Sequence, residues 1–210
     1  MNDIIEDNIL KFESSVPPST NHYNNWRAVP TGKFKLVKGK KERIYIPMAY
    51  PSDDYKKFKK EFHPYLKKIV EEYNWDIQPT IYTHYYLDII MYFDRIDKDS
   101  NNYFKCPLDV GNTIIYQDDK TIIARTKRVY YTYNEELKPH FEYELYPVDY
   151  IGIWESEEEY NQFIEKCKVC KNYKEGKCKR LSEYLAYKIT KDFDIKTRCC
   201  LGFKEIKVKK

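Results

Sequence analysis

One long stretch of the chain repeats apolar side chains at intervals of three and four residues. It runs over 53–73, directly after Pro51. A helix has about 3.6 residues per turn, so side chains at this spacing lie on one face. The pattern predicts an amphipathic helix whose buried face holds Tyr55, Phe58, Phe62, Leu66, Ile69 and Tyr73.

Four other segments carry the residue types that favour strands. They are the segments 7–14, 80–93, 120–133 and 139–148. The second is rich in β-branched and aromatic residues, which is typical of a buried strand. The last two are expected to pair antiparallel across a loop at 134–138.

Two shorter helices complete the pattern. One is expected over 101–112, with Ser100 or Asn101 as its N-cap. Pro107 should kink or break this helix, because proline lacks a backbone N–H. The other is expected over 157–167. We therefore predict an α+β domain over 1–150 and a small cysteine-rich module over 151–210.

Composition argues against a disordered or membrane-spanning chain. Aromatic residues make up 17% of the 210 residues, too many for a disordered chain. No apolar run approaches the ~20 residues that span a bilayer. The acidic segment 1–10 lacks the basic and apolar regions of a signal peptide. We expect a cytoplasmic protein with no membrane partner.

The basic residues are unevenly distributed. The segment 31–43, expected to be a loop or hairpin, holds six basic residues and one acidic residue, for a net charge of +5. The segment 166–180 has seven and one, for a net charge of +6, whereas 155–159 is acidic. Local basic patches suit a polyanionic partner. The alternative is that each patch is an ordinary solvated surface.

Acidic residues flank two of the predicted strands. Asp97 and Asp99 follow the strand that ends at Phe93, and Asp118 and Asp119 precede the next one. Carboxylates that converge repel one another unless a cation neutralises them, and oxygen ligands favour Mg²⁺ or Mn²⁺. Such an ion activates water and stabilises charge on a phosphate. By spacing alone, ordinary turn aspartates are the favoured alternative.

Three segments, in order, resemble the RusA family of Holliday junction resolvases. PPSTNHY at 17–23 is similar to that family's early Pro-Pro-Ser-x-Asn-x-x-Tyr segment. KDSNNYFKCPLD at 98–109 is similar to its Asp-x-Asp-Asn-x-x-Lys-x-x-x-Asp pattern, and IYQDDKTI at 115–122 to its Asp-Asp-Ser-Gln-Val pattern. The intervals also agree, and the resemblance covers about residues 7–148. It implies a mixed sheet with helices.

The resemblance assigns roles residue by residue. Asp99 matches the first metal-binding aspartate, and Asp119 the later one, with Asp118 beside it. Lys105 matches the catalytic lysine. Asn101 stands where the family has its second essential aspartate, so the magnesium site would lose one negative charge.

The implied activity is a Mg²⁺- or Mn²⁺-dependent endonuclease that cuts branched DNA as a homodimer. Asp97 is a candidate to supply the charge missing at Asn101. Two alternatives stay open: a junction-binding protein that has lost catalysis, and a zinc-containing adaptor for a protein partner. The expected DNA contacts are Asn21, Tyr23, Lys33, Lys35, Lys38, Lys40, Lys41 and Arg43.

Five of the six cysteines lie in the last part of the chain. They are Cys167, Cys170, Cys178, Cys199 and Cys200. A C-x-x-C pair in a cytosolic protein favours metal or redox chemistry over a structural disulfide. We predict a Zn²⁺ site with one of the two adjacent cysteines spare, and iron–sulfur ligation remains an alternative. Unligated thiols are the other alternative. The remaining Cys106 is expected in the core, and His84, in the middle of the predicted strand at 80–93, is expected to be packed.

Overall fold

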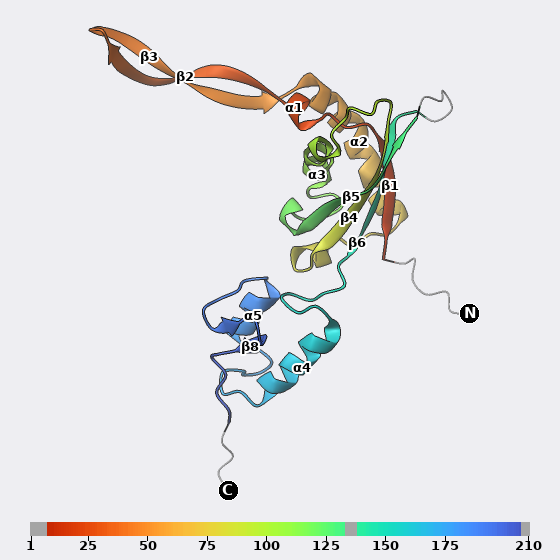
Figure 1. Ribbon diagram of the computed structural model, residues 1–210, viewed down its shortest axis with the longest axis vertical. Helices are drawn as coiled ribbons and strands as arrows, with labels where there is room; N and C mark the ends of the chain where they lie inside the picture. The colour runs from red at the N-terminus through yellow and green to blue at the C-terminus, as the bar shows by residue number, and fades with distance from the viewer. Residues whose placement is uncertain (1–7, 133–137, 207–210) are drawn as a thin grey trace.

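The computed structural model describes residues 8–132 and 138–206. The α+β class is confirmed: helices accompany a mixed sheet (Figure 1). In chain order, the elements, with η for 3₁₀-helices, are β1 (Leu10–Ser15), α1 (Thr20–Tyr23), β2 (Asn24–Val37), β3 (Lys40–Pro51), α2 (Asp53–Glu72), η1 (Gln78–Ile81), β4 (Tyr85–Phe93), η2 (Ser100–Tyr103), α3 (Lys105–Gly111), η3 (Asp119–Thr121), β5 (Ile122–Tyr131), β6 (His140–Pro147), α4 (Glu157–Lys168), α5 (Lys179–Leu185), β7 (Phe193–Asp194) and β8 (Cys199–Cys200).

The main sheet has the strand order β1-β6-β4-β5. Strand β6 is antiparallel to both β1 and β4, whereas β5 runs parallel to β4. The predicted antiparallel pairing of the last two strands is therefore wrong, because β5 and β6 lie on opposite sides of β4. The buried strand β4 lies inside the sheet, and β5 and β6 both pair with it. Most of the predicted loop at 134–138 lies outside the described residues.

Helices cover one face of this sheet. Alternate residues of β4, from Tyr85 to Phe93, are buried beneath them. Helix α2 packs on the same face, where the Phe12, Phe62 and Tyr143 rings meet with centroids 4.8–6.1 Å apart. The predicted face of this helix is confirmed from Tyr55 to Ile69, and the Ser52 hydroxyl caps it by accepting the Tyr55 N–H at 3.1 Å.

The opposite face of the sheet carries a polar network. The Asp88 carboxylate on β4 is buried and accepts hydrogen bonds from Arg125 and Tyr146, each at 2.7 Å. The Arg125 guanidinium also lies 3.6 Å from the centre of the Tyr86 ring. Because the partners come from β5 and β6, the network ties both neighbours to the central strand.

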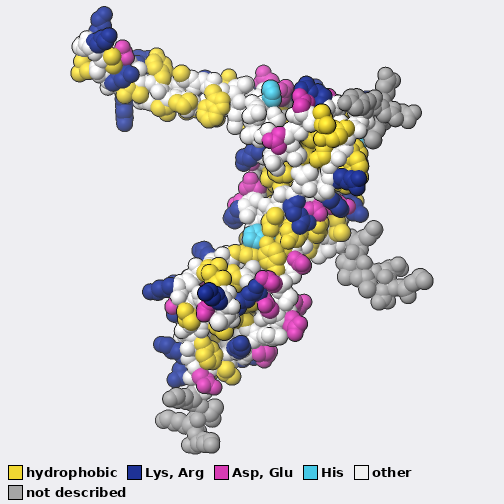
Figure 2. Space-filling view, viewed as in Figure 1, with side chains coloured by type: hydrophobic (Ala, Val, Ile, Leu, Met, Phe, Trp, Pro, Cys, Tyr) yellow, Lys and Arg dark blue, Asp and Glu magenta, His cyan; other side chains and the backbone are white. Residues whose placement is uncertain are grey.

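Strands β2 and β3 form a two-stranded ribbon that projects from the body (Figure 1). It extends well beyond the predicted loop or hairpin at 31–43. A two-residue turn joins the strands, and both turn residues have positive φ, 49° at Lys38 and 78° at Gly39. Basic side chains gather at the tip and apolar ones along the length (Figure 2). The exposed apolar side chains of the ribbon are Trp26, Phe34, Leu36, Tyr45, Ile46, Met48 and Tyr50.

The helix predicted over 101–112 is broken, as expected. A 3₁₀ turn, η2, ends at Tyr103, and α3 begins at Lys105. Pro107 then lies in the first turn of α3, where its missing N–H costs no helical hydrogen bond. The predicted strand at 80–93 is shorter than expected, because η1 occupies its first residues and β4 begins at Tyr85.

The C-terminal part has its own cluster of buried residues. Trp154, Phe163, Leu181, Tyr184 and Phe193 form it, between α4 and α5. Tyr187, just after α5, reaches the main sheet, where its ring lies 3.8 Å from His84 and its hydroxyl accepts the His84 N–H at 3.2 Å. His84 is thus packed against Tyr187, but it precedes β4 and is only partly buried. Within the described ranges, no helix has both the length and the apolar character that crossing a bilayer requires.

We predict that Asp88→Asn lowers the free energy of unfolding by about 1–3 kcal/mol at neutral pH, because Arg125 loses its charged partner. Burial raises the pKa of Asp88, but its hydrogen bonds to Arg125 and Tyr146 outweigh this and hold the pKa below 3.8. The Asp88 charge therefore stabilises the fold fully above the unfolded-state pKa of about 3.8, and this contribution is lost as the pH falls through the lower folded-state pKa.

Urea unfolding from pH 7 to pH 2 measures this effect. The difference between wild type and Asp88→Asn should shrink in acid. The exposed Asp54 on α2 supplies the matched variant, Asp54→Asn, which should stay within about 0.5 kcal/mol of wild type. A constant difference at all pH values would contradict the role given to the Asp88 charge.

Candidate functional site

Four polar side chains from the three matched segments join in one cluster. The Lys105 ammonium lies 2.6 Å from Asp109 Oδ1 and 3.7 Å from Asp119 Oδ2. The Tyr23 hydroxyl donates to the other oxygen of Asp109. We call these four residues, Tyr23, Lys105, Asp109 and Asp119, the carboxylate–lysine cluster. Tyr23 belongs to the first segment, Lys105 and Asp109 to the second, and Asp119 to the third.

Helix α3 positions two members of the cluster. Lys105 and Asp109 are four residues apart, so they lie one helical turn apart on the same face. The adjacent face of the helix is anchored by the buried side chains of Cys106 and Val110. Gly111 allows the close approach of Tyr116, since a Cβ there would lie 2.5 Å from the Tyr116 hydroxyl oxygen.

Asp119 is held by the segment that leads into β5. The Trp75 indole N–H donates to the Ile115 carbonyl at 2.9 Å, and the Gln117 N–H donates to Thr80 Oγ1, also at 2.9 Å. Both bonds anchor this segment to the region after α2. Asp119 then opens η3 with its side chain partly exposed.

The cluster is electrostatically unbalanced. Two carboxylates share the Lys105 ammonium, so the group carries one net negative charge with Tyr23 neutral. The hydrogen bond to Asp109, with the negative charges of Asp109 and Asp119, raises the pKa of Lys105. Burial and the bond to Asp109 raise the pKa of Tyr23. Lys105 therefore stays protonated at neutral pH and acts as a fixed positive charge.

Asp99 lies in the loop that follows β4. Its carboxylate accepts the Asn101 backbone N–H at 3.0 Å and the Asn102 side-chain N–H at 3.3 Å. Asn101 is exposed. No hydrogen bond or ion pair within 8–132 and 138–206 links Asp99 to Lys105, Asp109 or Asp119.

The other two acidic candidates are each paired locally. Asp97 is exposed and bonds to the Arg95 guanidinium. Asp118 accepts the Lys120 backbone N–H at 3.0 Å and pairs with its ammonium at 2.9 Å, which lowers the pKa of Asp118. Both carboxylates therefore already hold a cationic partner outside the cluster.

The donor chemistry of the cluster suits a hard cation. Asp109 and Asp119 already share one positive charge, and carboxylate oxygens are the ligands that Mg²⁺ and Mn²⁺ prefer. Among the described residues, however, no group of three or more His, Cys, Asp or Glu side chains is arranged to hold a metal ion. The fit therefore extends to these two carboxylates alone.

Asp109 is a site residue that the sequence interpretation did not single out. It ends the second matched segment, four residues after Lys105, so the sequence could have predicted that both lie on one face of a helix. The sequence could not have predicted its bond to Tyr23, because 86 residues separate the two. Tyr23, expected to contact DNA, instead points its hydroxyl into the cluster.

The other expected DNA contacts are exposed. Asn21 lies in α1, beside the base of the ribbon, and the six basic residues lie on β2, β3 and the turn. The Lys35 ammonium is 3.8 Å from Glu42, and the Arg43 guanidinium is 5.8 Å from the Phe34 ring centre. The ribbon tip is therefore a concentrated, solvent-facing positive charge.

The cysteines fall into three environments. Cys167, Cys170, Cys178 and Cys200 line one small cavity in the C-terminal part. Cys199 is turned elsewhere, and its thiol donates to the Thr197 carbonyl at 3.3 Å. Cys106 is buried in the main core, as predicted, and burial raises the pKa of its thiol to about 12.

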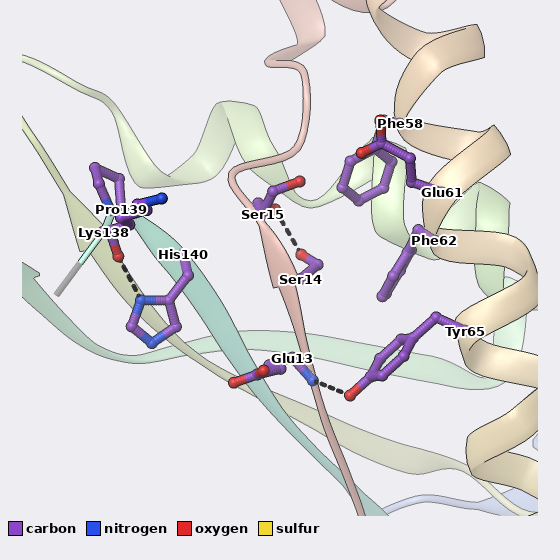
Figure 3. Close-up of a pocket in the computed structure, with 10 residues that line it drawn as sticks. All are labelled: Glu13, Ser14, Ser15, Phe58, Glu61, Phe62, Tyr65, Lys138, Pro139 and His140. Atoms are coloured by element: carbon purple, nitrogen blue, oxygen red, sulfur yellow. Dashed lines mark hydrogen bonds between the residues drawn. The ribbon is translucent and has the colours of Figure 1, made fainter. Parts of the chain in front are cut away.

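A separate groove of about 630 Å³ runs between β1, α2 and the start of β6 (Figure 3). Figure 3 shows Tyr65 reaching from α2 to accept the Glu13 N–H, and His140 Nδ1 bonded to the Lys138 carbonyl. No predicted site residue lines this groove. We therefore place the candidate site at the carboxylate–lysine cluster.

Comparison with protein-family models and with curated proteins finds no match for this chain. The RusA resemblance therefore rests on the three segments alone. The cluster adds one physical fact to it: side chains from all three segments meet in the folded chain.

Proposed function

We propose that this protein is a metal-dependent endonuclease that cuts branched DNA. The observation that carries the proposal is the carboxylate–lysine cluster, in which Tyr23, Lys105, Asp109 and Asp119 meet from three distant segments. Neither a core role nor a turn role requires acidic and basic side chains from three segments to meet at a partly exposed surface.

Each residue of the cluster has a definite task in this proposal. Asp109 and Asp119 would hold Mg²⁺ or Mn²⁺. When bound, such an ion supplies an activated water and stabilises negative charge on the phosphate. Lys105 keeps its proton and offers a positive charge to a phosphate oxygen. Tyr23 orients Asp109 by donating to one of its two oxygens.

The ribbon would supply affinity. Its exposed lysines and arginine can contact phosphates, which positions DNA without reading its sequence. A homodimer is part of the proposal, because a four-way junction has approximate two-fold symmetry and two of its strands must be cut.

A non-catalytic junction-binding protein is the second candidate. The observations that favour it are the neutral, exposed Asn101 and the position of Asp99 outside the contacts of the cluster. Binding without metal-dependent cleavage would select this candidate over the first.

We predict that the purified protein cleaves a labelled four-way junction with Mg²⁺ or Mn²⁺ and not with EDTA. Asp109→Asn and Asp119→Asn should each reduce cleavage at least ~100-fold while junction affinity changes less than ~3-fold. Asp99 matches a metal-binding aspartate through the resemblance alone, so a comparable loss in Asp99→Asn would show that its loop joins the site when DNA is bound. Asp54→Asn is the matched control and should cleave like wild type. Cleavage that survives in Asp119→Asn would contradict the proposed site.

We predict that Asn101→Asp lowers the Mg²⁺ concentration needed for half-maximal cleavage, since it restores a carboxylate where the resemblance implies a metal ligand. The competing explanation is that Asp97 already supplies that charge. In that case Asn101→Asp changes little, and Asp97→Asn is as damaging as Asp99→Asn. Magnesium titrations of cleavage by wild type, Asn101→Asp and Asp97→Asn distinguish these outcomes. If no titration shifts, the 97–101 loop is not part of a metal site.

We predict that replacing Lys38, Lys40 and Lys41 with Ala weakens junction binding and reduces the slope of log affinity against log salt by about 2–3. Fewer counterions are released when fewer phosphates are contacted. The control replaces three exposed lysines of α2, Lys60, Lys67 and Lys68, and thus makes the same change in net charge. Equal slopes in the two variants would show that the ribbon tip does not contact DNA.

A further inference from the structure

Four thiols from separate points of the C-terminal part share one cavity. Cys167 lies near the end of α4, Cys170 follows it, Cys178 precedes α5, and Cys200 lies in β8. The cavity measures about 20 Å³. A single water-sized sphere needs ~10–15 Å³, so the space suits one ion.

The backbone around the thiols forms tight, ordered turns. The Cys170 N–H donates to the Cys167 carbonyl at 2.9 Å, and the Tyr173 N–H donates to the Cys170 carbonyl at 3.0 Å. The Lys204 N–H points at Cys170 Sγ at 3.4 Å, and the Tyr184 hydroxyl points at Cys200 Sγ at 3.8 Å. Hydrogen bonds of this kind stabilise sulfur that carries negative charge.

We infer that Cys167, Cys170, Cys178 and Cys200 bind one Zn²⁺ as four thiolates. This inference is independent of the proposed nuclease activity. Zinc takes four sulfur ligands at ~2.3 Å in closed structural sites. Iron–sulfur ligation uses the same residue type, and elemental analysis distinguishes the two. The described side chains do not already form a ligand cage, so binding draws the four thiols together around the cavity that they share.

Cys199 and Cys200 point in different directions because they are neighbours in strand β8. Successive strand side chains point to opposite sides, so β8 can aim only one of them at the cavity. Cys200 lines the cavity, whereas the thiol of Cys199 bonds to Thr197. Cys199 is therefore the spare thiol.

The basic residues of 166–180 have a matching role here. Zinc bound to four thiolates carries two net negative charges, and this segment, which supplies three of the four ligands, has a net charge of +6. Arg180 also lines the cavity and pairs with Asp192 at 2.9 Å. The positive charge of this segment thus offsets the negative charge of the inferred metal site. The basic patch at 166–180 can therefore be explained without a DNA partner.

Backbone hydrogen bonds also tie residues 204–206 to residues 169–171, beside the cysteines. The Lys171 N–H donates to the Lys204 carbonyl at 2.7 Å, and the Ile206 N–H to the Val169 carbonyl at 2.9 Å. Cys178 directly precedes α5, whose Leu181 and Tyr184 form part of the buried cluster. Metal binding and folding of this part are therefore coupled.

We predict that the full chain, purified without chelators, contains about one zinc ion, measured by elemental analysis. Cys200→Ser should lower zinc affinity by more than the ~10–100-fold typical of changes outside the ligand shell. Cys199→Ser, in the same strand, should keep zinc at the wild-type level. Replacing zinc with Co²⁺ should give the visible absorption of a tetrahedral thiolate site in wild type and Cys199→Ser only.

Three results would overturn the inference: neither zinc nor iron in the wild-type protein, iron with acid-labile sulfide in place of zinc, or zinc retained in Cys200→Ser and lost in Cys199→Ser. Cys106→Ser tests a thiol outside the cavity and should keep its zinc. Asp119→Asn should also keep its zinc whether or not the protein cuts DNA, so failure of the nuclease proposal leaves this measurement unaffected.

Discussion

The parallel pairing of β4 with β5 is the constraint on which the rest of the structure depends. Parallel neighbours cannot be joined by a tight turn, so the chain must cross from one end of the sheet to the other. Here the crossover is residues 94–121, which contain η2, α3 and η3. The acidic candidates and Lys105 all lie on this crossover. Burial of β4 therefore fixes both ends of the segment that carries the chemistry.

Within that crossover, charge is arranged around one lysine. The ammonium of Lys105 sits where two carboxylates would otherwise repel each other, so the folded protein carries its own neutralising cation. A divalent ion that binds these carboxylates would displace part of that interaction and free Lys105 to meet a phosphate. The same lysine would then stabilise the protein without DNA and serve the proposed reaction with it.

Local patterns predicted the four strands of the main sheet and helices α2 and α4, but not the length of the ribbon or the pairing of the strands. The three- and four-residue spacing from Tyr55 to Ile69 was enough to place α2, because a helix is a local structure. The pairing of β5 and β6 with β4 depended on β4 being buried inside the sheet. A local sequence pattern does not contain this information. The meeting of Tyr23 with Asp109 was hidden for the same reason. Strand alternation required that one of Cys199 and Cys200 be spare, but only the folded module identifies Cys200 as the one that lines the cavity.

The ribbon also sets a length scale. Strand β3 has 12 residues, which at ~3.3 Å per residue span about 40 Å. One turn of B-DNA is ~34 Å. On a single straight duplex, a tip and a cluster separated by that span would contact phosphates on different turns. Where two helical arms diverge, as in a branched molecule, the same span bridges from one arm to the next. In the proposed function, the ribbon would let the protein respond to the angle between DNA arms, a property that no local contact with a phosphate can supply.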